Sequence, residues 1–260
     1  MPDPMRKKLR KDEVALGVSL TYPNPNCIES LARGWDWVWI DGQHGQLDYQ
    51  TILHCVQVAE LTGVSSLVRV PGHSFECLGP ILDTAANAVM VPMVNTAEEA
   101  RQIVRNACFP PLGSRSYGGR RVVDRDGRDY YLAANRKLLL VCQIETPEAV
   151  ENAGEIASVE GVGGLFFGAE DLRIRLGIAN TTPINESKRL VRIMEKIAGA
   201  ARNNGKVAGN IAHTAQLFKL SVELGYRLIR GGADIFFLTG GSRTKLQELR
   251  EILTGFRKKK

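Results

Sequence analysis

Charged and amide side chains stand at the ends of several apolar segments in this sequence, as in "WVWIDGQHG" from Trp37 to Gly45. The residues at these ends are Asp41, His44, Arg69, Gln143, Glu145, Glu170 and Asp171. A carboxylate can hold a cation, an arginine can stabilise a developing negative charge, and a histidine exchanges protons near neutral pH. If the fold brings these ends together, the set predicts a centre for acid–base chemistry.

Each residue alone also has a purely structural explanation. Arg69 could make a structural ion pair, His44 could be a hydrogen-bonded core histidine, and Glu145 and Asp171 could stabilise the first turns of the helices that follow them. Two carboxylates on neighbouring strands, however, repel each other unless a cation lies between them or one is protonated. Arg69 and a divalent metal are both candidates for that cation.

The ligand types favour a hard metal ion. Carboxylate oxygens are typical ligands of Mg²⁺ or Mn²⁺, with water or substrate in the remaining positions. His54, His73 and His213 are scattered along the chain without the spacing of a zinc site. The sequence also lacks the glycine-rich phosphate-binding motifs and the G-x-S-x-G of serine hydrolases.

The elements that must position these residues alternate along the chain. Eight apolar, β-rich runs are predicted strands: residues 14–21, 35–40, 66–70, 88–94, 138–144, 163–167, 206–211 and 226–230. Amphipathic helices are predicted between them, over residues 49–61, 97–107, 147–157, 186–203 and 215–224. Nearly continuous hydrophobic strands, each followed by a helix, indicate a parallel sheet covered by helices.

Eight such units in 260 residues predict an α/β fold, a (β/α)₈ TIM barrel, rather than a doubly wound open sheet. No linker interrupts the pattern, so residues 1–260 are predicted to be a single domain. The carboxyl ends of barrel strands open on one face, where the polar strand ends would meet. The longest irregular segment, Pro110 to Asn135, is interpreted as a lid, an oligomer contact or a surface insertion.

The positive net charge of +6 is concentrated at the chain ends. Without residues 1–11 and 257–260, 25 basic and 27 acidic residues remain, so the basic tails are predicted to be solvated and frayed, and no nucleic-acid partner is expected. No apolar run is long enough for a membrane span, and the start lacks a signal-peptide pattern. With five cysteines in no paired spacing, these features predict a cytoplasmic protein with reduced thiols.

An ordered set of motifs resembles the class II, metal-dependent pyruvate aldolases, the group that contains 4-hydroxy-2-oxoheptanedioate aldolase and 2-dehydro-3-deoxyglucarate aldolase. The motifs are "DWVWIDGQHG", "LVRVPG", "VMVPMVNTAEEA", "PPLGSRSYG", "YYLAAN", "VCQIETPEAVEN" and "GLFFGAEDLRIRLG". The resemblance covers roughly Val14 to Gly232. It implies a (β/α)₈ barrel, a homohexamer built as a trimer of dimers that exchange their last helix, and a bound Mg²⁺, Mn²⁺ or Co²⁺ ion.

By the same resemblance, Glu145 and Asp171 match the metal ligands. Arg69 matches the residue that holds the keto oxygen, His44 the catalytic base and Asp41 the partner of that base.

The resemblance also implies a substrate-binding set, in which Gln143 is a substrate-side amide and the backbone at Gly168 and Ala169 contacts the pyruvate carboxylate. Three positions depart from the family pattern: Gln43 replaces a glutamate before the histidine, Glu170 replaces a small residue beside the metal aspartate, and Gly164 occupies a place often held by aspartate.

The activity implied is reversible cleavage of a 4-hydroxy-2-oxo acid to pyruvate and an aldehyde, through an enolate stabilised by the metal and Arg69. An acyl-CoA carbon–carbon lyase of the citrate-lyase type is an alternative, and Arg115, Arg120 and Arg121 would then supply a basic groove. A further alternative is a non-catalytic barrel that binds a 2-oxo acid or, through its tails, an anionic polymer. A Schiff-base aldolase is not favoured, because lysines 137 and 206 begin their strands at the opposite end.

Overall fold

The computed structural model describes residues 3–257, which form a closed barrel of eight parallel strands. Each strand is hydrogen-bonded to the next, and the last closes the barrel against the first. The strands are β1 (Ala15–Leu20), β2 (Trp37–Asp41), β3 (Ser65–Arg69), β4 (Ala88–Val91), β5 (Leu139–Ile144), β6 (Gly164–Phe167), β7 (Val207–Ile211) and β8 (Leu228–Ala233). The predicted α/β (β/α)₈ fold is confirmed, and each predicted strand overlaps an observed one.

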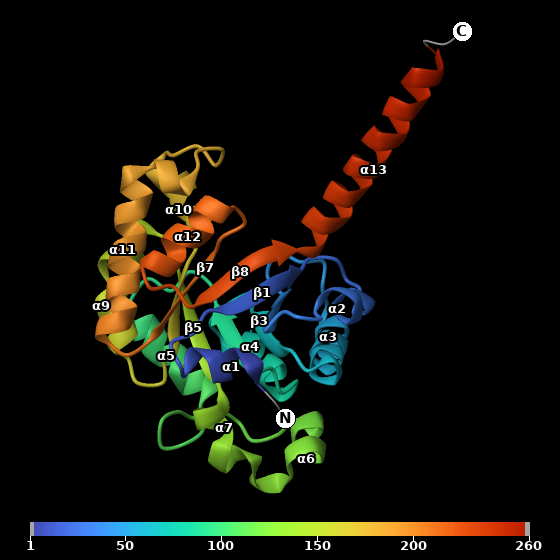
Figure 1. Ribbon diagram of the computed structural model, residues 1–260. Coiled ribbons are helices and arrows are strands. Elements are labelled where there is room, and N and C mark those ends of the chain that lie inside the picture. The colour runs from blue at the N-terminus through green and yellow to red at the C-terminus, as the bar shows by residue number, and fades with distance from the viewer. Residues whose placement is uncertain (1–2, 258–260) are drawn as a thin grey trace.

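Helices connect the strands and cover the outside of the barrel (Figure 1). They are α1 (Pro4–Leu9), α2 (Asn26–Leu31), α3 (Tyr49–Thr62), α4 (Phe75–Asp83), α5 (Ala97–Ala107), α6 (Arg120–Asp126), α7 (Tyr131–Lys137), α8 (Pro147–Glu151), α9 (Ala153–Ser158), α10 (Ala169–Leu176), α11 (Lys188–Asn203), α12 (Ala215–Glu223) and α13 (Asp234–Arg257), with short 3₁₀ turns at Arg128–Tyr130 and Ile184–Glu186. The helix predicted over residues 147–157 is divided at Asn152, whose side-chain amide donates to the carbonyl oxygen of Asn95 at 2.8 Å.

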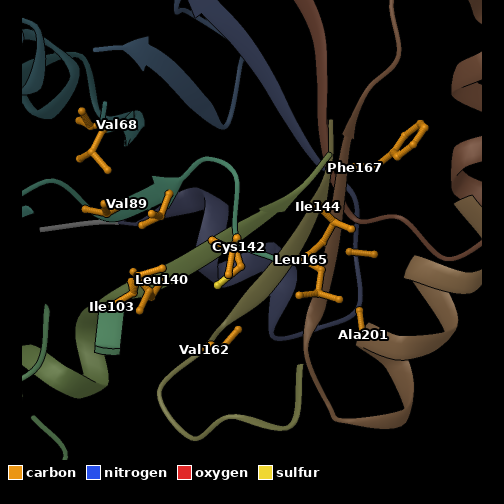
Figure 2. Close-up of a cluster of buried hydrophobic side chains, with 14 of the residues drawn as sticks. Val68, Val89, Ile103, Leu140, Cys142, Ile144, Val162, Leu165, Phe167 and Ala201 are labelled. Carbon is orange, nitrogen blue, oxygen red and sulfur yellow. The ribbon is translucent and has the colours of Figure 1, made fainter. Parts of the chain in front are cut away.

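Alternate residues of each strand face two different hydrophobic layers. On β5, Leu140, Cys142 and Ile144 point outward and pack under the helices, as Figure 2 shows. Val141 of β5 and Phe166 of β6 point inward and fill the barrel. Full burial of a large apolar side chain stabilises the fold by about 1.5–3 kcal/mol. Because both layers are filled, the strand ends are rigid supports for the side chains they carry.

Helix α1 packs against the amino ends of the strands, so the prediction of a frayed N-terminus was wrong for the residues described. Met5 is fully buried among the interior residues, and its amide donates to Ser65 Oγ at 3.2 Å. The Arg6 guanidinium donates to the carbonyl oxygen of Leu138 at 3.0 Å. The prediction rested on the basic charge of this segment, but its apolar residue Met5 fills the end of the barrel interior. Residues 258–260 of the basic C-terminus lie outside the described part of the chain.

The segment from Pro110 to Asn135 is partly helical and lies at the same end of the barrel as α1 (Figure 1). Arg121 donates to the carbonyl oxygen of Thr84, just after α4, at 2.6 Å, and forms an ion pair with Glu60 near the end of α3. Because the segment lies at the end of the barrel opposite the carboxyl ends of the strands, it cannot be a lid over that face of its own barrel.

Helix α13 projects away from the barrel (Figure 1). Residues 236–256 are all exposed, including a series of large apolar side chains: Phe236, Phe237, Leu238, Leu246, Leu249, Ile252, Leu253 and Phe256. Among the described residues, no helix combines the length and apolar content needed to cross a lipid bilayer.

Candidate active site

A cavity of about 190 Å³ opens at the carboxyl ends of the strands. It is lined by residues from seven of the eight strands or the loops that follow them, with only β4 and its loop not represented. The lining includes all eight predicted site residues: Asp41, His44, Arg69, Gln143, Glu145, Gly168, Ala169 and Asp171. The fold therefore converges the polar strand ends on one place, as the barrel prediction requires.

Two aromatic rings of the barrel interior line the cavity beneath these polar groups. Trp39 of β2 and Phe166 of β6 meet edge to face, with ring centroids 5.2 Å apart. The Arg69 guanidinium lies over the Trp39 ring, 4.9 Å from its centroid. The buried Trp39 ring therefore packs under the Arg69 guanidinium and helps to fix its position in the cavity.

Arg69 and Asp41 form a two-pronged ion pair, with Nε to Oδ1 at 2.9 Å and Nη2 to Oδ2 at 2.6 Å. The two residues are register partners on β3 and β2, so their side chains leave the sheet side by side. Burial alone would raise the pKa of Asp41, but the hydrogen bonds and charge of Arg69 outweigh it and lower that pKa below its ordinary value. Arg69 Nη1 also lies 3.5 Å from Gln143 Oε1.

Asp41, the predicted partner of His44, contacts the backbone of that residue. Asp41 Oδ1 accepts the backbone amide of His44 at 3.3 Å, while its carboxylate is engaged by Arg69. His44 itself is exposed at the rim of the cavity. Asp41 thus orients the loop that carries the histidine, because it holds that loop's backbone rather than the ring.

Glu145 is held from two sides. Its Oε1 accepts the backbone amide of Met93 at 2.8 Å, and its Oε2 accepts the side-chain amide of Gln143. The side chain is buried, at 2% exposure. Burial, opposed by the Met93 hydrogen bond and aided by the charge of Asp171, raises the pKa of Glu145 to about 7. The Glu145 carboxylate is therefore fixed in position, but the surrounding protein does not neutralise its negative charge.

Asp171 and Glu170 lie in the first turn of α10 and have different surroundings. Asp171 lines the cavity and is half-buried. Glu170 has 61% of its side chain exposed and forms an ion pair with Arg173 at 3.2 Å. Glu170 thus lines the same cavity, but its carboxylate is paired with Arg173 and is largely exposed.

Gly168 is required sterically at the end of β6. A Cβ at this position would lie 2.5 Å from Glu145 Oε2 and 2.9 Å from Gln143 Nε2. The amide of Gly168 donates to the carbonyl oxygen of Ile144 at 3.0 Å, so a contact of this backbone with a substrate carboxylate stays a prediction. The amide of Ala169, the first residue of α10, has no acceptor within its own helix.

Glu145 and Asp171 fit a hard divalent ion. No group of three or more histidine, cysteine, aspartate or glutamate side chains in residues 3–257 could hold a metal, which leaves a pair of carboxylates. Mg²⁺ is commonly bound by one or two carboxylates, with water and substrate oxygens completing the shell. The raised pKa of Glu145 has burial and a second negative charge among its causes, and a bound cation would compensate both.

Three residues around the site were not predicted from the sequence. Met93 has a backbone φ of 55° and aims its amide at Glu145, and Asn95 accepts Thr146 Oγ1 through its own side chain at 2.6 Å. No sequence signal identifies such loop contacts. Arg230 of β8 also lines the cavity, and the strand-end rule that selected Arg69 would have found it.

The arginines named for a nucleotide groove lie elsewhere. Arg115, Arg120 and Arg121 form ion pairs with Asp83, Asp124 and Glu60 respectively, around the amino end of the barrel. They do not line the cavity. The described lining includes no lysine either, which agrees with the prediction against Schiff-base chemistry.

Known proteins resemble the chain over nearly its whole length. Residues 17–238 match the HpcH/HpaI aldolase/citrate lyase family. A 4-hydroxy-2-oxovalerate aldolase of Novosphingobium aromaticivorans is 35% identical over 246 residues, 94% of this chain and 93% of its own. A hydroxypyruvate/pyruvate aldolase of Delftia acidovorans is 32% identical over 252 residues, 95% of this chain and 93% of its own. The crystal structure of an HpcH/HpaI aldolase from Desulfitobacterium hafniense superposes with a TM-score of 0.86 at 31% identity, covering 95% of this chain and 96% of that one. The chain therefore belongs to the HpcH/HpaI aldolase/citrate lyase family and is a carbon–carbon lyase of the aldolase type.

Proposed function

We propose that the protein is a metal-dependent class II aldolase that reversibly cleaves a 4-hydroxy-2-oxo acid to pyruvate and an aldehyde. The observation that carries the proposal is the convergence of Glu145, Asp171 and Arg69 on one small cavity. The names of the two aldolase relatives, which refer to 4-hydroxy-2-oxovalerate and to hydroxypyruvate and pyruvate, support a 2-oxo acid substrate.

Glu145 and Asp171 would hold the ion, which we propose to be Mg²⁺ or Mn²⁺, with Co²⁺ as a possible substitute. When bound, such an ion supplies a Lewis acid that stabilises negative charge on substrate oxygens. Gln143 and the Met93 amide keep the Glu145 carboxylate in place for this task.

The remaining chemistry belongs to side chains and backbone of the chain itself. His44 removes the proton of the 4-hydroxyl, the C3–C4 bond breaks, and the aldehyde leaves with its new C=O bond. The electron pair of the broken bond becomes an enolate, and the Arg69 guanidinium stabilises the charge that develops on its oxygen. Protonation of C3 then gives the methyl group of pyruvate. The free amide of Ala169 faces the substrate carboxylate, and Gln143 contacts the substrate through its side-chain amide.

We also propose that the working unit is a homo-oligomer, a hexamer in which dimers exchange α13. The apolar series on α13 supports this, since a helix that exposes such a series requires a partner surface.

Two measurements test the aldolase proposal. Pyruvate release from 4-hydroxy-2-oxo acids should require the metal and stop in EDTA. Exchange of pyruvate methyl protons with D₂O should fall by about 10²–10⁴-fold in His44→Ala, because the exchange needs the base. His54→Ala, which removes an exposed histidine of α3, is the matched control and should exchange at the parental rate.

Parental exchange in His44→Ala would remove that residue from the base role. Absence of both exchange and pyruvate release in the parent enzyme would favour the non-catalytic barrel.

A further inference from the structure

Arg230 points into the barrel from β8. Leu228, two residues earlier, belongs to the interior cluster, whereas Ile229 belongs to the outer layer under the helices. Successive side chains of a strand face opposite sides, so Arg230 faces inward, one level above Leu228. There it lines the same cavity as Arg69 and Glu145.

The guanidinium of Arg230 lacks partners that its burial would normally demand. Its Nε and Nη1 atoms are buried and have no hydrogen-bond partner among the described residues. The nearby carboxylates are committed elsewhere. Asp41 is paired with Arg69, and Asp234 accepts the backbone amides of Thr21 and Tyr22 at 2.9 and 3.0 Å. A buried donor without an acceptor is costly, and a charged donor more so.

Arg230 remains protonated although it is largely buried. Burial and the nearby Arg69 lower the pKa of Arg230, but only to about 10. The side chain is therefore a cation at neutral pH. Its apolar neighbour is Phe236 of α13, whose ring centroid lies 6.0 Å from the guanidinium carbon.

Hydroxyl groups accompany this cation. Ser19, at the inward face of β1, and Thr21, just beyond it, line the cavity, and β1 is hydrogen-bonded to β8. In the closed order of strands, β8 and β1 lie across the barrel from β4 and β5, the side that carries Glu145. The cavity thus has the proposed metal ligand Glu145 on one side and Arg230 with two hydroxyl groups on the other.

We propose that Arg230, with Ser19 and Thr21, binds a second anionic group of the substrate, in its aldehyde half. The natural acceptor would then be an aldehyde that carries a carboxylate or a phosphate. This inference rests on the proposed aldol reaction, in which Ala169 and the metal site take the carboxylate of pyruvate and leave Arg230 free. Arg230 is accordingly a specificity-determining residue, outside the proton-transfer machinery.

The test compares two aldehydes of the same length as acceptors for pyruvate: succinic semialdehyde, which is anionic, and methyl 4-oxobutanoate, its neutral ester. The parent enzyme should prefer the anion in kcat/KM by about 10- to 100-fold, the range expected of a hydrogen-bonded charge. Arg230→Met should lose most of that preference through the KM of the anion, and Arg230→Lys should retain part of it. Arg189→Met, an exposed site on α11, is the matched control and should behave like the parent.

Pyruvate methyl-proton exchange in D₂O separates this inference from the proposed function, because the exchange needs no aldehyde. It should proceed in Arg230→Met at the parental rate. Equal loss of exchange and of addition to both aldehydes would overturn the inference, since Arg230 would then hold pyruvate itself. A parent enzyme that exchanges protons but shows no preference between the two aldehydes would overturn it as well. A parent that does not exchange at all would instead overturn the proposed function.

Discussion

Glu145 and Asp41 are carboxylates of one cavity, yet their pKa values are shifted in opposite directions. Burial raises both, but Asp41 receives two hydrogen bonds and a full positive charge from Arg69, which lower its pKa overall. Glu145 receives neutral amide donors and faces Asp171, so its pKa remains raised, at about 7. One carboxylate is satisfied by the protein, and the other is left to be satisfied by a proton or a cation.

This difference predicts how the stability of the metal-free protein depends on pH. The folded-state pKa of Glu145, about 7, exceeds its ordinary value of 4.5. Proton binding therefore contributes stability that is fully present below pH 4.5 and is lost as the pH rises through 7. Glu145→Gln stays neutral, so relative to the parent it should gain about 3 kcal/mol of unfolding free energy between pH 4.5 and 8.

Urea unfolding in EDTA at several pH values measures this gain. Glu155→Gln, which removes an exposed carboxylate of α9, controls for the loss of one charge. A constant difference between Glu145→Gln and the parent across the pH range would contradict the assigned cause.

Among the elements, the connection from β4 to α5 helps to position Glu145, which lies on a different part of the chain, just after β5. Met93 turns its amide toward Glu145 from a backbone conformation with positive φ. The connection is anchored at its far end by α5, where Thr96 and Glu99 form a capping box. Such reciprocal capping satisfies two otherwise free amides and defines where the helix begins. The proposed metal ligand is thus held by the loop of a neighbouring unit as well as by its own strand.

The contribution of helix α1 to the stability of the barrel can be measured directly. Met5→Ala should lower the free energy of unfolding by about 2–5 kcal/mol, because Met5 is fully buried in the barrel interior. Lys7→Ala, an exposed position of the same helix, should change it by less than about 0.5 kcal/mol. Chemical denaturation of both variants measures the difference. Equal, small effects would mean that α1 does not close the barrel in solution.

At the scale of the whole molecule, residues 3–257 form no eighth outer helix that packs against the barrel. Each of the first seven strands is followed by a helix that packs against the barrel, but α13 leaves β8 and extends into solvent (Figure 1). Leu246, Leu249, Leu253 and Phe256 recur at spacings of three and four, which places them on one face of that helix. In the proposed hexamer, this apolar face is the one that would contact a second copy of the chain.

Introducing charge on that face should therefore weaken assembly. The double variant Leu249→Glu/Leu253→Glu should raise the dissociation constant of the oligomer by at least roughly 100-fold, since buried interface anchors contribute 2 kcal/mol or more each. Sedimentation velocity over a range of concentrations measures the change. Thr244→Glu adds a charge on the opposite face and should assemble normally. Unchanged assembly of the double variant would exclude α13 as the contact.

Much of this architecture could be predicted from local pattern. The alternation of apolar runs with amphipathic helices sufficed for the barrel, and helix α5 lies over the same residues as predicted. The rule that strand ends carry the chemistry selected Glu145, Asp171 and Arg69 before their convergence was known. The rule was not applied to Arg230, although the predicted strand over residues 226–230 ends there. It could not find Met93, because a backbone amide has no signature in the side-chain sequence.

The sequence by itself determined which side chains stand at the carboxyl ends of the strands, because that depends only on local periodicity and on the geometry of a parallel barrel. Only the tertiary structure decided how those side chains are partnered: Asp41 with Arg69, Glu145 with the Met93 amide, and Arg230 with no hydrogen-bond partner for its buried Nε and Nη1 atoms. Partnership depends on distances of a few ångströms between residues far apart in the chain. Charge interactions and hydrogen bonds change steeply over such distances, and no local pattern encodes them.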